Sequence, residues 1–149
     1  MEIKFWEDRN KKIIEKNLYS KVADDIANKV YEDYQSSRSK KNNISQIRKF
    51  YDEVLRFDSI LKSFPEEKRN EEFKKILPYL NMLNSKAAYA EARELVSEKF
   101  RNFIKAGLSN IHEKSDFDVF VGLFEAFMGF YKYYVEVESK RERNNNRNR

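Results

Sequence analysis

The stretch that decides the fold is Ile44-Ser45-Gln46-Ile47-Arg48-Lys49-Phe50-Tyr51. Its apolar residues begin a helical period that continues to Leu61, and Pro65 follows. This pattern predicts an amphipathic helix over residues 45–64 whose apolar face is buried. On its helical wheel Lys49 points away from the core and Arg48 lies at the edge. Phe50 and Tyr51 follow the period of the buried face, so we assign them to the core and not to a surface on which nucleic-acid bases could stack.

A basic run, Ser36-Ser37-Arg38-Ser39-Lys40-Lys41-Asn42-Asn43, precedes this helix and is expected to be a mobile loop. Residues 36–49 hold five Lys or Arg and no acid, and residues 140–149 hold five more with one acid, in a chain of net charge +5. Positive charge gathered in two places favours a polyanion as partner. The free N–H groups at the start of the helix favour anions too.

The composition predicts an all-α protein. The 149 residues suit one domain, and only three Gly and two Pro leave little material for the turns of a β-protein. We expect a compact bundle of about five helices with a long central helix. That helix spans Tyr79 to about Lys105, starts after Pro78, and is closed by Gly107. Its two apolar stripes, one including Tyr89, indicate that it packs on two sides.

Three parts of the chain are distinguished. Residues 1–18 are poorly patterned, residues 19–139 form a single helical domain, and residues 140–149 are expected to be a disordered basic tail. The last helix starts near Ser115 or Asp116, either a good N-cap, and runs to about Ser139.

The sequence carries no pattern of an enzyme. It has no Cys, a single His at position 112, and no phosphate-binding Gly-rich loop or metal-binding helix motif. We therefore expect no catalytic residues, no metal, no cofactor and no small-molecule substrate. Residues 117–135 are apolar but contain three charged residues, each costing about 2.5–3.5 kcal/mol at a bilayer centre. With no signal peptide visible, we expect a cytoplasmic protein with no membrane contact.

Three further cations are candidates for phosphate contact. Lys86 and Arg93 are seven residues apart and so share a helix face at roughly 10 Å, and Lys132 lies on the last helix. The alternative for Lys86 and Arg93 is that their aliphatic stems merely cover the bundle. The alternative for Arg48 and Lys49 is intrahelical pairing with Asp52 and Glu53.

Three blocks of the sequence resemble a known family. Residues 45–54, Ser-Gln-Ile-Arg-Lys-Phe-Tyr-Asp-Glu-Val, resemble the opening block of the small subunit of type III-A CRISPR effector (Csm) complexes. Residues 80–93, Leu-Asn-Met-Leu-Asn-Ser-Lys-Ala-Ala-Tyr-Ala-Glu-Ala-Arg, look like its central block, and residues 124–134, Phe-Glu-Ala-Phe-Met-Gly-Phe-Tyr-Lys-Tyr-Tyr, like its C-terminal block. The blocks occur in the family's order.

The resemblance implies a small all-helical subunit without a catalytic centre, present in several copies beside the subunits that hold the guide RNA. Its expected partners are the target RNA and guide RNA duplex, other subunits of the complex, and further copies of itself. It would contact the RNA backbone without reading sequence, as protein does in other guided effectors. The RNA-binding residues expected from the blocks and the basic run are Arg38, Lys40, Lys41, Arg48, Lys49, Lys86, Arg93 and Lys132. One departure is Asn84-Ser85, which stands where the family often has a basic residue.

Two other functions remain open from the sequence. The chain could be a purely structural helical homo-oligomer or scaffold whose basic residues contact protein partners. It could also be a bundle-type DNA-binding regulator.

Overall fold

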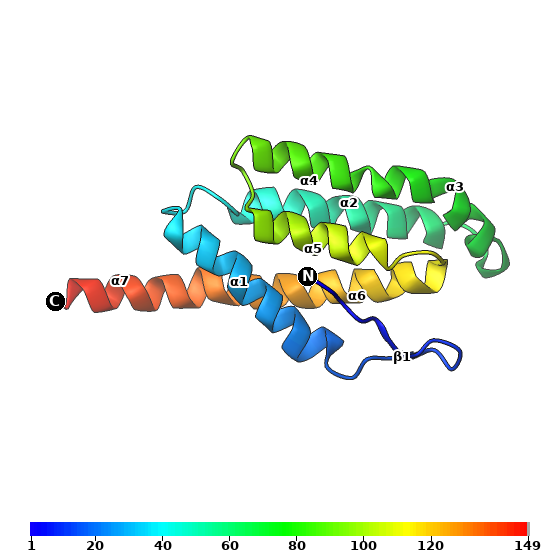
Figure 1. The fold of residues 1–149 in the computed structure, drawn as a ribbon, viewed down its shortest axis with the longest axis horizontal. Coiled ribbons are helices and arrows are strands. Elements are labelled where there is room, and N and C mark those ends of the chain that lie inside the picture. Colours follow the sequence, from blue (N-terminus) through cyan, green and yellow to red (C-terminus); the bar gives the residue numbers. More distant parts are fainter. Residues whose placement is uncertain (149) are drawn as a thin grey trace.

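The structure, a computed structural model, describes residues 1–148 and is an all-α fold. Five helical rods build it (Figure 1), because α3 continues into α4 past Met82, and α6 continues through a π-helical turn (Tyr134–Glu138) into α7. A short antiparallel pair of strands, β1 (Trp6–Asp8) and β2 (Ile13–Ile14), precedes them. The helices are α1 (Ala23–Ser36), α2 (Ile44–Lys62), α3 (Arg69–Asn81), α4 (Leu83–Ala92), α5 (Glu98–Ser109), α6 (Lys114–Tyr133) and α7 (Ser139–Arg147).

The core helix is α6, against which α1, α2 and α5 pack. Its apolar face is buried along its whole length and carries a row of aromatic rings, with Phe127 stacked on Phe103 of α5 at 4.8 Å between centroids and on Tyr131 at 5.6 Å. Tyr51 of α2 meets Phe124 on the same helix at 5.3 Å. Interlocked aromatic pairs add about 0.5–1.5 kcal/mol each beyond the area they bury. The all-α prediction is confirmed. Phe50 is buried in the core, and Tyr51 is half-buried and packs against it.

The predicted long helix over residues 79–105 is wrong, because the chain turns back between α4 and α5. Glu94 adopts a left-handed conformation with φ 61°, and its N–H donates to the Glu91 carbonyl at 2.9 Å. The next N–H, of Leu95, donates to the Ala90 carbonyl at 2.9 Å. This pair of bonds is a Schellman helix end, here formed without the usual glycine.

The predicted start and end of that helix are also wrong. Pro78 lies inside α3 and does not start a helix. Gly107 lies inside α5, where its missing Cβ leaves room for the Phe120 ring of α6.

The loop before α2 is anchored, in contrast to the mobile loop expected. It begins with a second Schellman helix end, at the end of α1. There the backbone N–H of Arg38 (φ 55°) donates to the Gln35 carbonyl, and the N–H of Ser39 donates to the Tyr34 carbonyl. Asn42 then lies fully buried between three helices. Its Nδ2 donates to the Val30 carbonyl at 3.1 Å and to Ser97 Oγ at 2.9 Å, and its Oδ1 accepts from Ser97 N at 2.8 Å.

The N-terminal segment packs against α5 and α6. Phe5 is buried in the core, and the Asn110 side chain donates to the Ile3 carbonyl at 2.9 Å. Asp116 in the first turn of α6 is fully buried and accepts from Trp6 Nε1 and Arg9, each at 2.7 Å. Asp116 is not the N-cap that the sequence indicated, because Glu113 holds that place and Asp116 completes its capping box.

The prediction of a disordered basic tail is also wrong, since residues 139–147 form the helix α7; Arg149 lies outside the described residues. No Gly or Pro interrupts the chain between Phe130 and Arg147, so the backbone of α6 continues outward. Tyr31 of α1 and Ser139 share a hydrogen bond of 3.1 Å, which ties the start of α7 to the bundle. Figure 1 shows α7 projecting past one end. Within residues 1–148, no helix is both long and apolar enough to cross a membrane.

Candidate nucleic-acid interface

Most of the candidate cations lie at one end of the bundle, where the loop before α2 meets the ends of two other helices. Asn42 fixes this geometry: its N–H donates to the Leu95 carbonyl after α4 at 3.0 Å, and its carbonyl accepts from the Tyr131 hydroxyl on α6. The start of α2, the end of α4 and the end of α6 are therefore held together. Six of the eight candidate cations lie on this loop or within two helical turns of it along α2 or α4.

A groove of about 330 Å³ between α2 and α4 holds two of the candidates. Lys49 and Lys86 lie on its two sides, on neighbouring helices, and both side chains are exposed. Its lining residues are Gln46, Lys49, Phe50, Glu53, Leu83, Lys86 and Ala90. Two cations across a narrow groove can meet consecutive phosphates of one strand.

One acid in the groove, Glu53, is engaged elsewhere. Arg56 donates to it at 2.6 and 3.1 Å, whereas Lys86 Nζ lies 3.8 Å away. The hydrogen bond from Arg56 lowers the pKa of Glu53, and the charges of Arg56 and Lys86 add to this against the opposing effect of burial. Lys86 Nζ is thus held near the groove by one long contact with Glu53, which leaves its other N–H donors free for a phosphate.

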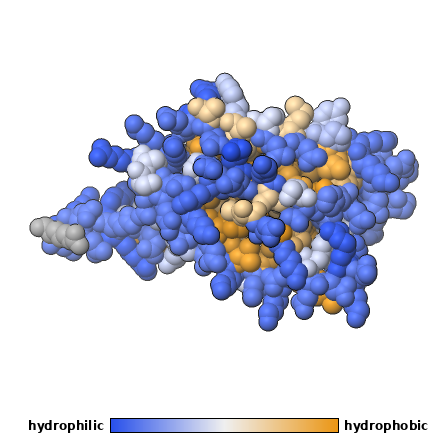
Figure 2. Space-filling model, viewed as in Figure 1, coloured by the Kyte–Doolittle hydropathy of each residue, from blue (hydrophilic) through white to orange (hydrophobic). Residues whose placement is uncertain are grey.

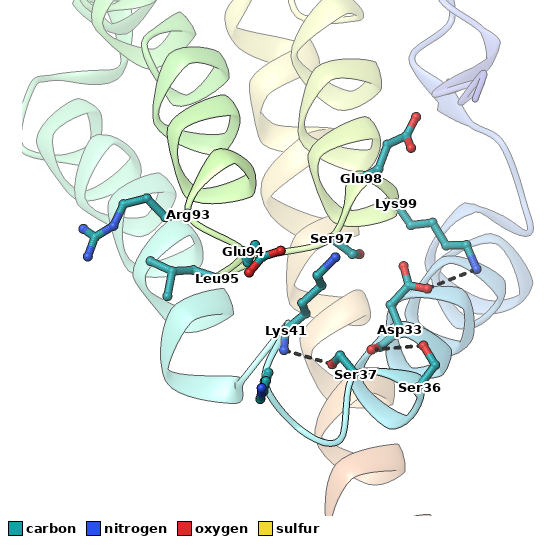
Figure 3. A pocket seen from close by; sticks show the side chains of 11 residues that line it. Asp33, Ser36, Ser37, Lys41, Arg93, Glu94, Leu95, Ser97, Glu98 and Lys99 are labelled. Carbon is teal, nitrogen blue, oxygen red and sulfur yellow. Dashed lines mark hydrogen bonds and ion pairs between the residues drawn. The ribbon is translucent and has the colours of Figure 1, made fainter.

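A second groove of about 840 Å³ opens beside the loop and is lined by Lys40, Lys41 and Arg93 (Figure 3). It also contains acids from α1 and from the turn before α5, of which Asp33 pairs with Lys99 at 3.5 Å. Arg93 points away from this acidic side in Figure 3. Its guanidinium lies 5.6 Å from the centroid of the Tyr89 ring on the same helix.

The remaining candidates lie outside these two grooves. Arg48 is exposed and about 100° around α2 from Lys49, on the side where Tyr51 meets α6. Lys132 is exposed on α6, one residue after Tyr131. Arg38 is exposed in the helix-ending turn. The structure therefore joins Lys49 with Lys86, and Lys40 and Lys41 with Arg93, but does not place all eight residues on one face.

Most of these cations lack an acidic partner. Among residues 1–148, none of Arg38, Lys40, Lys41, Arg48, Lys49, Arg93 and Lys132 has a carboxylate oxygen within 4.0 Å of its side-chain nitrogens. The pairing of Arg48 and Lys49 with Asp52 and Glu53 is accordingly not seen in the described part of the chain. Cations without local neutralisation carry their full charge toward an approaching polyanion.

The start of α2 offers fewer free donors than the sequence suggested. Asn43 is the N-cap, and its side chain accepts from Ser45 N at 3.0 Å and from Ser45 Oγ at 2.8 Å. One of the N–H groups expected to face an anion is therefore occupied. The interface rests on side-chain charge more than on the helix terminus.

Sequence reasoning missed two features of this end. Asn42 was read as part of a flexible polar run, and nothing in its neighbours marks it as buried. Tyr89 was assigned to an apolar stripe of a helix packed on two sides, whereas its side chain is exposed. That assignment followed from the missed turn at Glu94.

The family can now be assigned. A family model described as Csm2 Type III-A matches residues 14–137 of the chain. The chain belongs to the Csm2 Type III-A family. Searches of curated proteins and of solved structures gave no match to it.

Membership of Csm2 fixes the general role of the chain. It is the small subunit of the type III-A effector, a non-catalytic structural subunit that associates with the other Csm subunits and with the guide RNA and its target. The match covers all three sequence blocks and every candidate cation. Residues 1–148 contain no cluster of three or more His, Cys, Asp or Glu side chains suited to a metal.

Proposed function

We propose that this subunit binds the backbone of the target RNA within the guide–target duplex, without sequence specificity, and thereby stabilises the filament of the complex. The observation that carries the proposal is the pair of cations on the two sides of the α2/α4 groove, Lys49 and Lys86. Arg93 follows Lys86 by seven residues on the same face of the helix. The other exposed cations around the loop, Arg38, Lys40, Lys41, Arg48 and Lys132, extend the same positive end.

The chemistry of these residues suits phosphate more than base edges. Lysine presents a mobile point charge, which attracts phosphate without fixing a hydrogen-bond pattern that reads a base. Sequence recognition is then left to pairing between guide and target. The rigid placement of the groove by Asn42 keeps the cations at a fixed spacing, so repeated copies would present a repeated phosphate track.

The experiment compares two double variants in the assembled, guide-loaded complex. Lys86→Ala with Arg93→Ala removes two cations of the proposed surface, and Glu53 keeps its partner Arg56. The matched control is Lys74→Ala with Lys105→Ala, two exposed cations on α3 and α5 that lie outside both grooves. Binding of labelled target RNA is measured for two unrelated target sequences.

We expect the first variant to weaken target binding about tenfold or more, by the same factor for both targets, and the control to bind like the unmodified complex. Normal binding by the Lys86/Arg93 variant would remove these residues from the site. If that variant no longer assembles into the guide-loaded complex, its cations contact protein subunits, as the scaffold alternative requires.

A further inference from the structure

The outer edge of the α3–α4 rod exposes an unusual set of side chains. Tyr79, Met82 and Tyr89 are 63%, 51% and 65% exposed, although their apolar surface favours burial. Figure 2 shows tan and pale atoms interrupting the blue surface along this edge. Single exposed apolar residues are common, but three on one edge form a patch.

The patch has a regular spacing and includes two cations. Tyr79, Met82, Lys86, Tyr89 and Arg93 follow one another at steps of three and four residues, which places them on one side of the rod. The backbone of Met82 between α3 and α4 stays helical, so the row continues across the junction. Lys86 also lines the α2/α4 groove, so the row borders the proposed RNA surface.

The groups in this row offer ring faces beside positive charge. The Arg93 guanidinium lies 5.6 Å from the Tyr89 ring centroid, and none of the five positions is acidic. Aromatic rings interleaved with Lys and Arg are the usual platform for single-stranded nucleic acid, because bases stack on the rings while phosphates meet the cations. Tyr, Met and Arg are also enriched at protein–protein interfaces, so the test below includes self-association as an outcome that would assign the row to a protein partner.

We propose that unpaired nucleotides of an RNA strand stack on Tyr89 and Tyr79, with Lys86 and Arg93 holding the adjoining phosphates. This inference rests on the proposed RNA-binding function and adds that nucleotides left unpaired beside the guide–target duplex are held at this edge. Tyr89 is the main platform, because Arg93 lies against its ring and can extend the stack.

The test uses the full chain and a labelled single-stranded RNA of mixed sequence, with an RNA of the same length whose central nucleotides are abasic. Tyr79→Ala with Tyr89→Ala removes both rings, and Tyr79→Phe with Tyr89→Phe retains them. Both residues are exposed, so these changes leave the core intact, which thermal unfolding checks. The Lys49→Ala with Lys86→Ala variant is measured in parallel.

We expect the double alanine variant to bind the intact RNA about tenfold or more weakly and the double phenylalanine variant to bind normally. On the abasic RNA, the unmodified chain and the alanine variant should bind alike.

Equal binding of the intact RNA by the unmodified chain and the alanine variant overturns the stacking proposal. The phosphate surface still stands in that case if Lys49→Ala with Lys86→Ala weakens binding. If none of the variants weakens binding, the RNA-binding function itself fails. An alanine variant that binds RNA normally but loses self-association in sedimentation identifies the edge as a protein interface and also overturns the proposal.

Discussion

The hydroxyl of Tyr131 on α6 donates a hydrogen bond to the main-chain carbonyl of Asn42, in the loop before α2. This bond joins two residues 89 positions apart and holds the basic loop against the end of the core helix. The placement of the cations around the α2/α4 groove depends on it, because the loop sets where α2 begins.

Replacing Asn42 should destabilise the fold strongly. Asn42→Ala leaves the Val30 carbonyl and the Ser97 N–H without their partner and puts alanine at φ 62°. We expect the free energy of unfolding to fall by about 2–4 kcal/mol. Chemical denaturation measures it, with Asn43→Ala as the control, since loss of that N-cap costs only about 1 kcal/mol. Equal losses for the two variants would show that Asn42 is no more than a local turn residue.

The stability of the protein should fall at high pH, and Tyr131 should account for part of that fall. Burial raises the pKa of the Tyr131 hydroxyl above its ordinary value of 10.0, with smaller contributions from Tyr34, Tyr31 and Asp33. A raised pKa means that the stabilisation is complete below pH 10 and is lost as the pH rises above it. Tyr131→Phe should lose about 1 kcal/mol near neutral pH and show a shallower alkaline fall. Identical alkaline slopes for the two proteins would contradict this reading.

Asp116 should control part of the acid stability. Burial by itself raises the pKa of Asp116, but hydrogen bonds from Trp6, from the N–H groups of His112 and Glu113, and from Arg9 together lower it below 3.8. A lowered pKa means that the stabilisation is present above pH 3.8 and is lost as the pH falls through the folded-state pKa. Asp116→Asn should lower the free energy of unfolding by about 2–4 kcal/mol at pH 7 and flatten its acid dependence. Denaturation curves at pH 7, 4 and 3 measure both, and an unchanged slope would assign the acid dependence to other carboxylates.

Two glycines in helices should respond oppositely to alanine. A Cβ at Gly107 would collide with the Phe120 ring, whereas a Cβ at Gly129 meets nothing within 4 Å. Gly107→Ala should therefore destabilise by about 1–3 kcal/mol, and Gly129→Ala should stabilise by about 0.5–1 kcal/mol. Thermal unfolding of the two variants measures the difference. Destabilisation by Gly129→Ala would mean that its open face is used in the folded chain.

The sequence was sufficient for the helical class and most of the core, because periodicity records which face of a helix is buried. It failed where the chain changes direction without glycine or proline. Glu94 ends α4 in a left-handed conformation that charged residues rarely adopt, so the sequence pattern indicated one helix in place of α4 and α5. The prediction of a disordered tail was wrong because a polar run without apolar residues can still be helical when it continues a packed helix.

The sequence named the candidate cations but did not indicate how they are arranged in the fold. Spacing alone put Lys86 and Arg93 on one helix face, which the structure retains. That Lys49 lies across a groove from Lys86 depends on how α2 and α4 pack. Such pairing between helices leaves no mark in the local sequence.

The salt dependence of RNA binding tests the central claim most directly. The affinity of the full chain for a single-stranded RNA is measured over a range of salt concentrations, for the unmodified chain, for Lys49→Ala with Lys86→Ala, and for the control Lys74→Ala with Lys105→Ala. If Lys49 and Lys86 each neutralise a phosphate, the slope of log affinity against log salt should shrink by about 1.4 in the first variant and stay unchanged in the control. An unchanged slope in the Lys49/Lys86 variant, or an equal reduction in the control, would contradict a backbone-binding groove between α2 and α4.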